Sequence, residues 1–156
     1  MEATMDTVKH DSKTLIFGAF ERVSFPLLNI DDTIAKVDTG ADSGAVHCVS
    51  INVTTRESDG KKVLQYVPMH NHNTVIETEH FVRANVRGST GHQLPRFIIE
   101  TKIVIHGKEY SIRIGLSDRT DMKTDILIGR RFLSENNVLV NVKLNQNLKK
   151  DEGGGQ

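Results

Sequence analysis

The residues best suited to chemistry in this sequence are Asp38, Thr39 and Gly40, which directly follow the short apolar segment 34–37. Three of the four residues in that segment are apolar, which predicts a buried strand. A carboxylate at the end of such a strand is held rigidly, and the Thr39 hydroxyl can lock the turn. Gly40 lets the backbone pass close to whatever lies over Asp38. The pattern is typical of a carboxylate that acts on a bound molecule, and the competing interpretation is an ordinary turn cap.

A second stretch strengthens the catalytic interpretation. Residues 125–128 read Asp-Ile-Leu-Ile, which predicts another buried strand, and they lead directly into Gly129 and Arg130. The segment Arg130–Glu135 is expected to form a short helix. The sequence therefore places two buried strands beside two distinctive turns, one centred on a carboxylate and the other on Gly-Arg.

Together these stretches resemble the retropepsins, the single-domain aspartic proteases. The block Ile-Ala-Lys-Val-Asp-Thr-Gly-Ala-Asp-Ser-Gly-Ala-Val-His and the block Leu-Ser-Asp-Arg-Thr-Asp-Met-Lys-Thr-Asp-Ile-Leu-Ile-Gly-Arg-Arg-Phe-Leu are similar to one branch of them. That branch is a RimB-like family labelled ATP-dependent zinc protease and linked with RimK-type ATP-grasp ligases. The resemblance implies an all-β, closed retropepsin-like (acid protease) barrel with one short C-terminal helix.

The resemblance also implies an aspartic endopeptidase in which Asp38 is the catalytic residue. This chemistry needs two carboxylates that share a proton across one water, so that one activates the water while the other polarises the scissile carbonyl. The chain supplies only one Asp-Thr-Gly. An Asp38/Asp38 dyad would therefore require a symmetric homodimer with its site on the two-fold axis. The expected substrate is a peptide or protein, and no cofactor is expected.

Supporting roles follow from the same resemblance. Asp42 is expected to pair with Arg130 beside the site and so to tie the catalytic turn to the helix start. The branch more often carries Arg at the position of Asp42. This departure weakens the expectation of an Asp42–Arg130 pair but not the expectation of the fold. The residues expected to support the catalytic loop and to form the second-strand motif are Thr39, Gly40, Ala41, Ile128 and Gly129.

Several other features leave alternatives open. A flap must close over a bound peptide, and segments 56–62 and 69–80 are the two candidates. The charged loop 117–124 either contacts substrate or is solvated next to the site. His47 either supports the loop or the dimer, or lies at the edge of the core. Cys48 is expected to be a small buried hydrophobe.

A metal site is not expected. His70 and His72, with His80 downstream, could lie on one side of a strand, but a lone His-x-His is a weak signal. The sequence contains no His-Glu-x-x-His motif. These histidines are therefore predicted to be solvated loop residues.

The bulk composition limits the remaining possibilities. The 156 residues suit one domain, expected over 14–148 with a flexible arm at 1–13 and a disordered tail at 149–156. Lys plus Arg and Asp plus Glu both number 20, so no global charge favours nucleic acid or an acidic membrane. No apolar run approaches the roughly 18 residues that span a bilayer. The single cysteine and the absence of a signal peptide predict a cytoplasmic protein.

The predicted elements are short strands, without the helix alternation of a parallel sheet. Segments 96–105 and 109–116 predict a hairpin around His106-Gly107-Lys108, and segment 138–144 predicts a last strand. This pattern by itself indicates an all-β barrel or sandwich.

A second function remains open beside proteolysis. The same barrel could bind a peptide or a partner enzyme, such as an ATP-grasp ligase, without cutting it. A monomer could do this, because one Asp38 cannot form a dyad.

Overall fold

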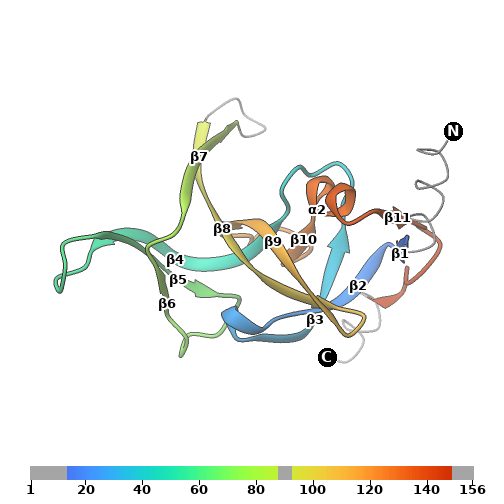
Figure 1. The fold of residues 1–156 in the computed structure, drawn as a ribbon, viewed down its shortest axis with the longest axis horizontal. Helices are drawn as coiled ribbons and strands as arrows, with labels where there is room; N and C mark the ends of the chain where they lie inside the picture. Colours follow the sequence, from blue (N-terminus) through green and yellow to red (C-terminus); the bar gives the residue numbers. More distant parts are fainter. Residues whose placement is uncertain (1–13, 88–92, 149–156) are drawn as a thin grey trace, which may run out of the picture.

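The computed structural model describes residues 14–87 and 93–148, so the expected arm 1–13 and tail 149–156 lie outside the described residues. The regular secondary structure of the described chain is almost all strand (Figure 1), and none of its helices is long and apolar enough to cross a membrane. The elements are β1 (Leu15–Phe17), β2 (Phe20–Phe25), the 3-10 turn η1 (Pro26–Leu28), β3 (Ile30–Val37), β4 (Ala45–Thr55), β5 (Lys62–Pro68), β6 (Ile76–Thr78), β7 (Val82–Arg87), β8 (Gln93–Ile105), β9 (Lys108–Ser117), β10 (Ile126–Ile128), α2 (Arg130–Glu135) and β11 (Val138–Val140).

Six strands close into a barrel in the order β10, β3, β2, β8, β9 and β4, with β4 pairing back onto β10. Alternation along the strands fills its interior: in β9, Ile112 and Ile114 are buried while Arg113 between them is exposed. Phe25 and Ile128 join the same core from other strands. The prediction of a closed all-β barrel with one short helix is confirmed.

The β8–β9 hairpin forms the longest ladder of this barrel. Its register runs from Phe97 opposite Leu116 to Ile105 opposite Lys108. The turn consists of His106 and Gly107, whose φ angles of 53° and 75° are those of a tight two-residue hairpin. The predicted hairpin is confirmed, although β8 starts three residues earlier, at Gln93.

Strand β10 lies between β3 and β4, which are consecutive in the sequence. It pairs with β3 in parallel, Ile128 opposite Val37, and with β4 in antiparallel, Leu127 opposite Ala45. The chain that joins β3 to β4 must therefore pass over the end of β10. This crossing brings the Asp-Thr-Gly turn and the Gly-Arg turn, 91 positions apart in the sequence, into contact.

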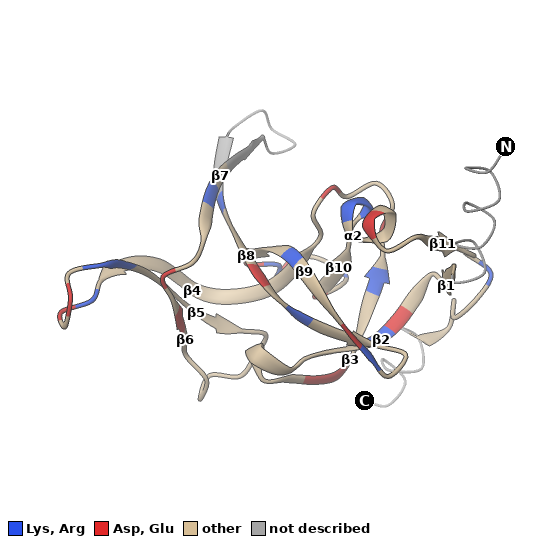
Figure 2. Ribbon diagram, viewed as in Figure 1, with Lys and Arg blue, Asp and Glu red and all other residues tan. Residues whose placement is uncertain are grey.

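The β4–β5 hairpin extends well beyond the barrel (Figure 1, left), with β6 paired along β5. Charges of both signs follow this arm (Figure 2). Arg56 at its tip lies 2.6 Å from a carboxylate oxygen of Asp59 and 2.9 Å from one of Glu79, and Lys61 lies 3.2 Å from Glu79. These ion pairs fasten the tip to the segment after β6.

Strands β1 and β11 pair in parallel and form a separate two-stranded sheet. The predicted strand 138–144 is wrong in its second half, because β11 ends at Val140. Its partner β1 ends at Phe17, whose carbonyl accepts a backbone hydrogen bond from Asn141 at 2.9 Å. Val142 and Leu144 continue the apolar alternation but are exposed.

Glu21 is a buried carboxylate that fastens three separate parts of the chain. It accepts hydrogen bonds from the Gly18 backbone N–H at 2.7 Å and from the Asn145 side chain at 3.0 Å. Its other oxygen lies 2.8 Å from His106 Nε2 in the β8–β9 turn. The β1–β2 connection is fixed in this way, and its Ala19 carbonyl accepts the Val37 N–H at the end of β3 at 3.0 Å.

Candidate active site

Asp38 is the first residue after β3, and its backbone is fixed by β10. The Asp38 N–H donates to the Ile128 carbonyl at 2.9 Å, and the Asp38 carbonyl accepts from the Ala41 N–H at 3.2 Å. The Gly40 N–H donates to Asp38 Oδ1 at 3.0 Å, which fixes the orientation of the side chain. Asp38 is half-buried while Thr39 and Gly40 are exposed. The carboxylate is therefore held rigidly at a turn that faces solvent.

The Gly129–Arg130 turn interlocks with the Asp38 turn. The Arg130 N–H donates to the Ala41 carbonyl at 2.7 Å, and the next N–H of the helix donates to the Asp42 carbonyl at 3.0 Å. A Cβ on Gly129 would lie 2.5 Å from the Gly44 nitrogen and 2.6 Å from the Asp42 carbonyl oxygen. Only glycine allows this approach, so the two sequence motifs form one packed unit.

Asp42 and Arg130 are brought together as expected, at 3.4 Å between Oδ1 and Nη2. Arg131 shares the same carboxylate at 3.3 Å, and all three side chains are more than half exposed. Arg130 also reaches the Thr39 carbonyl at 3.4 Å. Exposed ion pairs contribute about 0–1 kcal/mol, so this cluster orders the turn more than it stabilises the fold.

Two cavities border the Asp38 turn. One, of about 370 Å³, is lined by Asp38, by one residue each of β2, β3 and β10, and by the loop 117–124. The other, of about 590 Å³, is lined by the turn 41–45 and by Ala84, Arg96 and Ile98 of the β7–β8 hairpin. Neither candidate flap segment, 56–62 or 69–80, lines either cavity. Described residues of the β7–β8 hairpin form the wall instead.

Arg119 lines both cavities and was not singled out from the sequence. It is only 7% exposed, whereas the neighbouring Asp118 is exposed. Its Nε donates to the Thr124 carbonyl at 2.9 Å, and in the described parts of the chain no carboxylate lies within 4.0 Å of its guanidinium. Burial, followed by repulsion from Arg96, lowers the pKa of Arg119, and the negative charges of Asp125 and Asp38 oppose that shift.

Nothing in the local sequence distinguishes Arg119 from the other charged residues of its loop. The charged sequence of loop 117–124 left two interpretations open, contact with substrate and solvation beside the site. The fold turns one of these side chains inward, where loop, β4 and β10 meet. For Arg119 the interpretation of a fully solvated loop is wrong.

The histidines near the site do not gather around a metal position. His70 is exposed; its ring lies 4.9 Å from that of buried His47, and its Nε2 lies 3.7 Å from an Asp125 oxygen. Over residues 14–87 and 93–148 no group of three His, Cys, Asp or Glu side chains could hold a metal ion. The donor set described therefore does not fit the zinc in the family label.

Cys48 is buried in the core beside these histidines. Burial raises the pKa of its thiol to about 12, while a hydrogen bond from the Met69 backbone works in the opposite direction. The prediction that Cys48 is a small buried hydrophobe is confirmed, and a thiol of this kind is a poor nucleophile.

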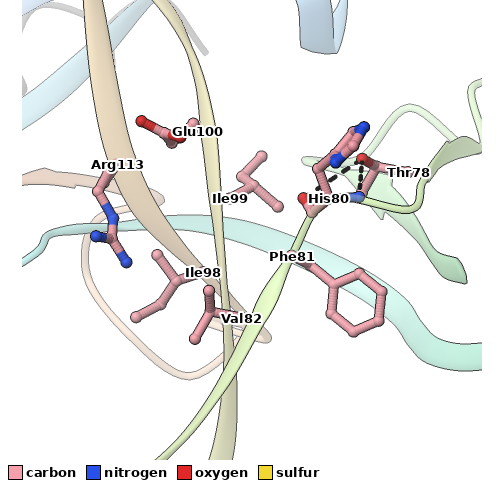
Figure 3. A pocket seen from close by; sticks show the side chains of 8 residues that line it. All are labelled: Thr78, His80, Phe81, Val82, Ile98, Ile99, Glu100 and Arg113. Atoms are coloured by element: carbon pink, nitrogen blue, oxygen red, sulfur yellow. Dashed lines mark hydrogen bonds between the residues drawn. The ribbon is translucent and has the colours of Figure 1, made fainter. Parts of the chain in front are cut away.

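A separate cavity of about 360 Å³ lies between the β6–β7 connection and the middle of β8 (Figure 3). Its lining includes His80 and Phe81 on one side and the cross-strand neighbours Glu100 and Arg113 on the other. No residue of the Asp38 turn lines it. This cavity is therefore distinct from the site around Asp38.

Comparison with known proteins agrees with this fold. A family model described as "Retropepsin-like aspartic endopeptidase RimB" matches residues 16–151. The crystal structure of Lpg0085, a Legionella pneumophila protein of unknown function, is similar with a TM-score of 0.63 and 25% identity, over 83% of this chain and 95% of that one.

Two relatives carry a different name. A Shewanella pealeana protein named "Probable alpha-L-glutamate ligase" is 30% identical over 127 residues, and a Desulfotalea psychrophila protein of the same name is 28% identical over 131 residues. These matches cover 80% and 82% of this chain but only 28% of each relative. The chain thus spans less than a third of the length of these proteins. Because the family model covers most of the sequence, the chain belongs to the RimB-like family, described as retropepsin-like aspartic endopeptidases.

Proposed function

We propose that the protein is a homodimeric aspartic endopeptidase that hydrolyses peptide bonds through a water activated by Asp38 of each subunit. The observation that carries the proposal is the rigid delivery of Asp38. Its backbone is bonded to β10, and its carboxylate accepts the Gly40 N–H at 3.0 Å. In a dyad one such carboxylate is ionised and acts as base, while the other stays protonated and polarises the carbonyl. This chemistry uses no cofactor.

The dimer is part of the proposal because each chain contributes one Asp-Thr-Gly. Thr39 and Gly40 are exposed, so a second turn can approach them across a two-fold axis. Like charges at close range cannot both ionise without a large cost, which is what makes the two carboxylates share a proton. Thr39, Gly40 and Ala41 would hold the loop, and Asp42 with Arg130 would fix it to the helix start.

We further propose a peptide that carries glutamate as the substrate, in the cytoplasm. The relatives named as α-L-glutamate ligases match this chain over part of their length. This match supports a substrate that such an ATP-grasp ligase makes. Arg96 and Arg119 both line the cavity beside the catalytic turn. Two guanidinium groups there favour a carboxylate-bearing substrate.

The test compares wild type with Asp38→Asn, a nearly isosteric uncharged variant, on a peptide library that includes glutamate runs, between pH 3 and 8. Solution mass is measured on the same samples. We expect cleavage by a dimer and its loss in Asp38→Asn. Asp121→Asn is the matched control, because Asp121 lines the same cavity from a loop rather than from the end of a buried strand. Equal loss of activity in Asp121→Asn would replace the intersubunit dyad with an intrachain pair.

A non-catalytic barrel that binds a peptide or a ligase is the second candidate. The observation that favours it is the match to proteins named as ligases over 28% of their length. Its signature is a folded monomer that binds glutamate peptides equally well with Asp38 or Asn at that position and cleaves none of them at any pH. That result would overturn the proposal of an endopeptidase.

A further inference from the structure

His47 is fully buried near the start of β4, next to the loop that carries Arg119. Its backbone is fixed on both sides, since its N–H donates to the Asp125 carbonyl at 2.7 Å and its carbonyl accepts from Met69 at 2.8 Å. Its ring Nδ1 accepts a hydrogen bond from the Arg119 backbone N–H at 2.8 Å. One ring atom therefore connects β4 to a residue 72 positions away.

The tautomer of this ring follows from its contacts. An Nδ1 that accepts an N–H carries a lone pair, so the ring proton resides on Nε2. Within the described residues, Nε2 is buried and has no hydrogen-bond partner. A leucine would fill similar space without burying an unpaired N–H, which is unfavourable. Packing alone therefore does not explain why an imidazole lies here, whereas the hydrogen bond that Nδ1 accepts from Arg119 does.

Nδ1 determines the position of the Arg119 backbone. That residue is 7% exposed, its Nε is bound to the Thr124 carbonyl, and it lines both cavities that flank the catalytic turn. The described structure offers its guanidinium no carboxylate within 4.0 Å. A buried cation without a carboxylate partner is unfavourable in the free protein and favours binding of an anionic group.

We propose that His47 is a positioning residue, whose Nδ1 holds the Arg119 backbone so that the Arg119 guanidinium binds a carboxylate of the substrate beside Asp38. The inference rests on the proposed function for the identity of that substrate. Arg119 then determines specificity, and His47 acts only through it. Two other groups face the ring: Asp118, with Oδ1 3.9 Å from Nδ1, and the exposed ring of His70.

Three variants separate the hydrogen bond from packing. In His47→Asn, the side-chain oxygen occupies the place of Nδ1 and can still accept the Arg119 N–H. In His47→Leu, the space is filled but no acceptor remains. His70→Ala is the control, because it removes the neighbouring ring and leaves the acceptor intact. Melting temperatures identify any variant that fails to fold.

Binding of acetylated tetraglutamate is measured by calorimetry in the full-length Asp38→Asn background, with tetraglutamine as the uncharged reference. We expect His47→Leu to weaken tetraglutamate binding roughly tenfold, as for one lost charge-assisted contact, while His47→Asn and His70→Ala stay within about threefold. In an Arg119→Gln background, His47→Leu should cause no further loss. Where cleavage is measurable, KM rises and kcat changes little.

Equal losses in His47→Leu and His47→Asn, or a loss that persists in Arg119→Gln, would overturn the proposal, as would a folded protein that does not bind tetraglutamate. A second measurement does not depend on variants or on cleavage. Nitrogen-15 spectra of the native protein should show His47 protonated on Nε2 and bare on Nδ1, and the opposite tautomer would refute the inference. If both measurements succeed but no peptide is cleaved, only the proposed protease function fails.

Discussion

Replacing Gly129 by alanine tests whether the two motifs act as one rigid unit. The new Cβ would lie 2.5 Å from the Gly44 nitrogen, and ordinary contacts begin at about 3.4 Å. The Gly129–Arg130 turn and the Asp38 turn must therefore separate by roughly 0.9 Å, the difference between these two distances. Overpacking of this kind costs about 1–3 kcal/mol. For a domain of this size, a cost of about 2 kcal/mol corresponds to a fall of about 4–8 °C in Tm.

The same displacement should impair catalysis more than folding. A shift of about 1 Å in a positioned group can cost about 10²-fold in rate, and Asp38 is bonded to the residue that precedes Gly129. Thermal denaturation and kcat/KM on a cleaved peptide, measured at a temperature where the variant is fully folded, separate the two effects. Gly107→Ala is the control, since its φ of +75° makes alanine strained but nothing lies within 4 Å of the new Cβ. If Gly129→Ala matched wild type in both measurements, the two turns would not be interlocked.

Two further predictions concern groups away from Asp38. Because burial raises the pKa of Cys48 to about 12, we expect iodoacetamide to leave it unmodified at pH 8 until denaturant unfolds the chain; rapid labelling of the native protein, followed by mass spectrometry, would contradict this. Arg56 lowers the pKa of Asp59 and of Glu79, so the stabilisation from these pairs is complete at neutral pH and is lost as pH falls through the depressed values. In Arg56→Gln, NMR titration should show higher pKa values for the Asp59 and Glu79 carboxyl groups than in wild type, with peptide cleavage unchanged. Unchanged pKa values would show that Arg56 does not pair with these carboxylates in solution.

Local sequence predicted most of the barrel because its strands alternate clearly. The β8–β9 hairpin and the helix Arg130–Glu135 were expected almost where they lie. The last strand was predicted too long, because the alternation continues to Leu144 while the partner strand ends at Phe17. A strand extends only as far as a neighbour accepts its hydrogen bonds, and no local pattern contains that information.

The site shows the same division. Asp38 could be named from the sequence because a carboxylate, Thr and Gly follow a buried strand, and the resemblance to retropepsins added Gly129 and Arg130. Arg119 could not be named from the sequence, because several charged residues lie in its loop. Only the packing of that loop against β4 shows which of them is buried. The flap candidates 56–62 and 69–80 line neither cavity beside the Asp38 turn, whereas Ala84, Arg96 and Ile98 of the β7–β8 hairpin line one of them.

The sequence by itself determined which residues can do chemistry: a carboxylate after a buried strand, and a glycine that a second strand presents to it. Residue type and alternation are local properties, and they carry this information directly. The tertiary structure alone decided which distant residues meet. The position of β10 between β3 and β4 brings the two turns together. The backbone N–H of Arg119, which lines both cavities, is bonded to the buried His47 ring. Those contacts depend on strand order and loop packing, which arise only when the whole barrel closes.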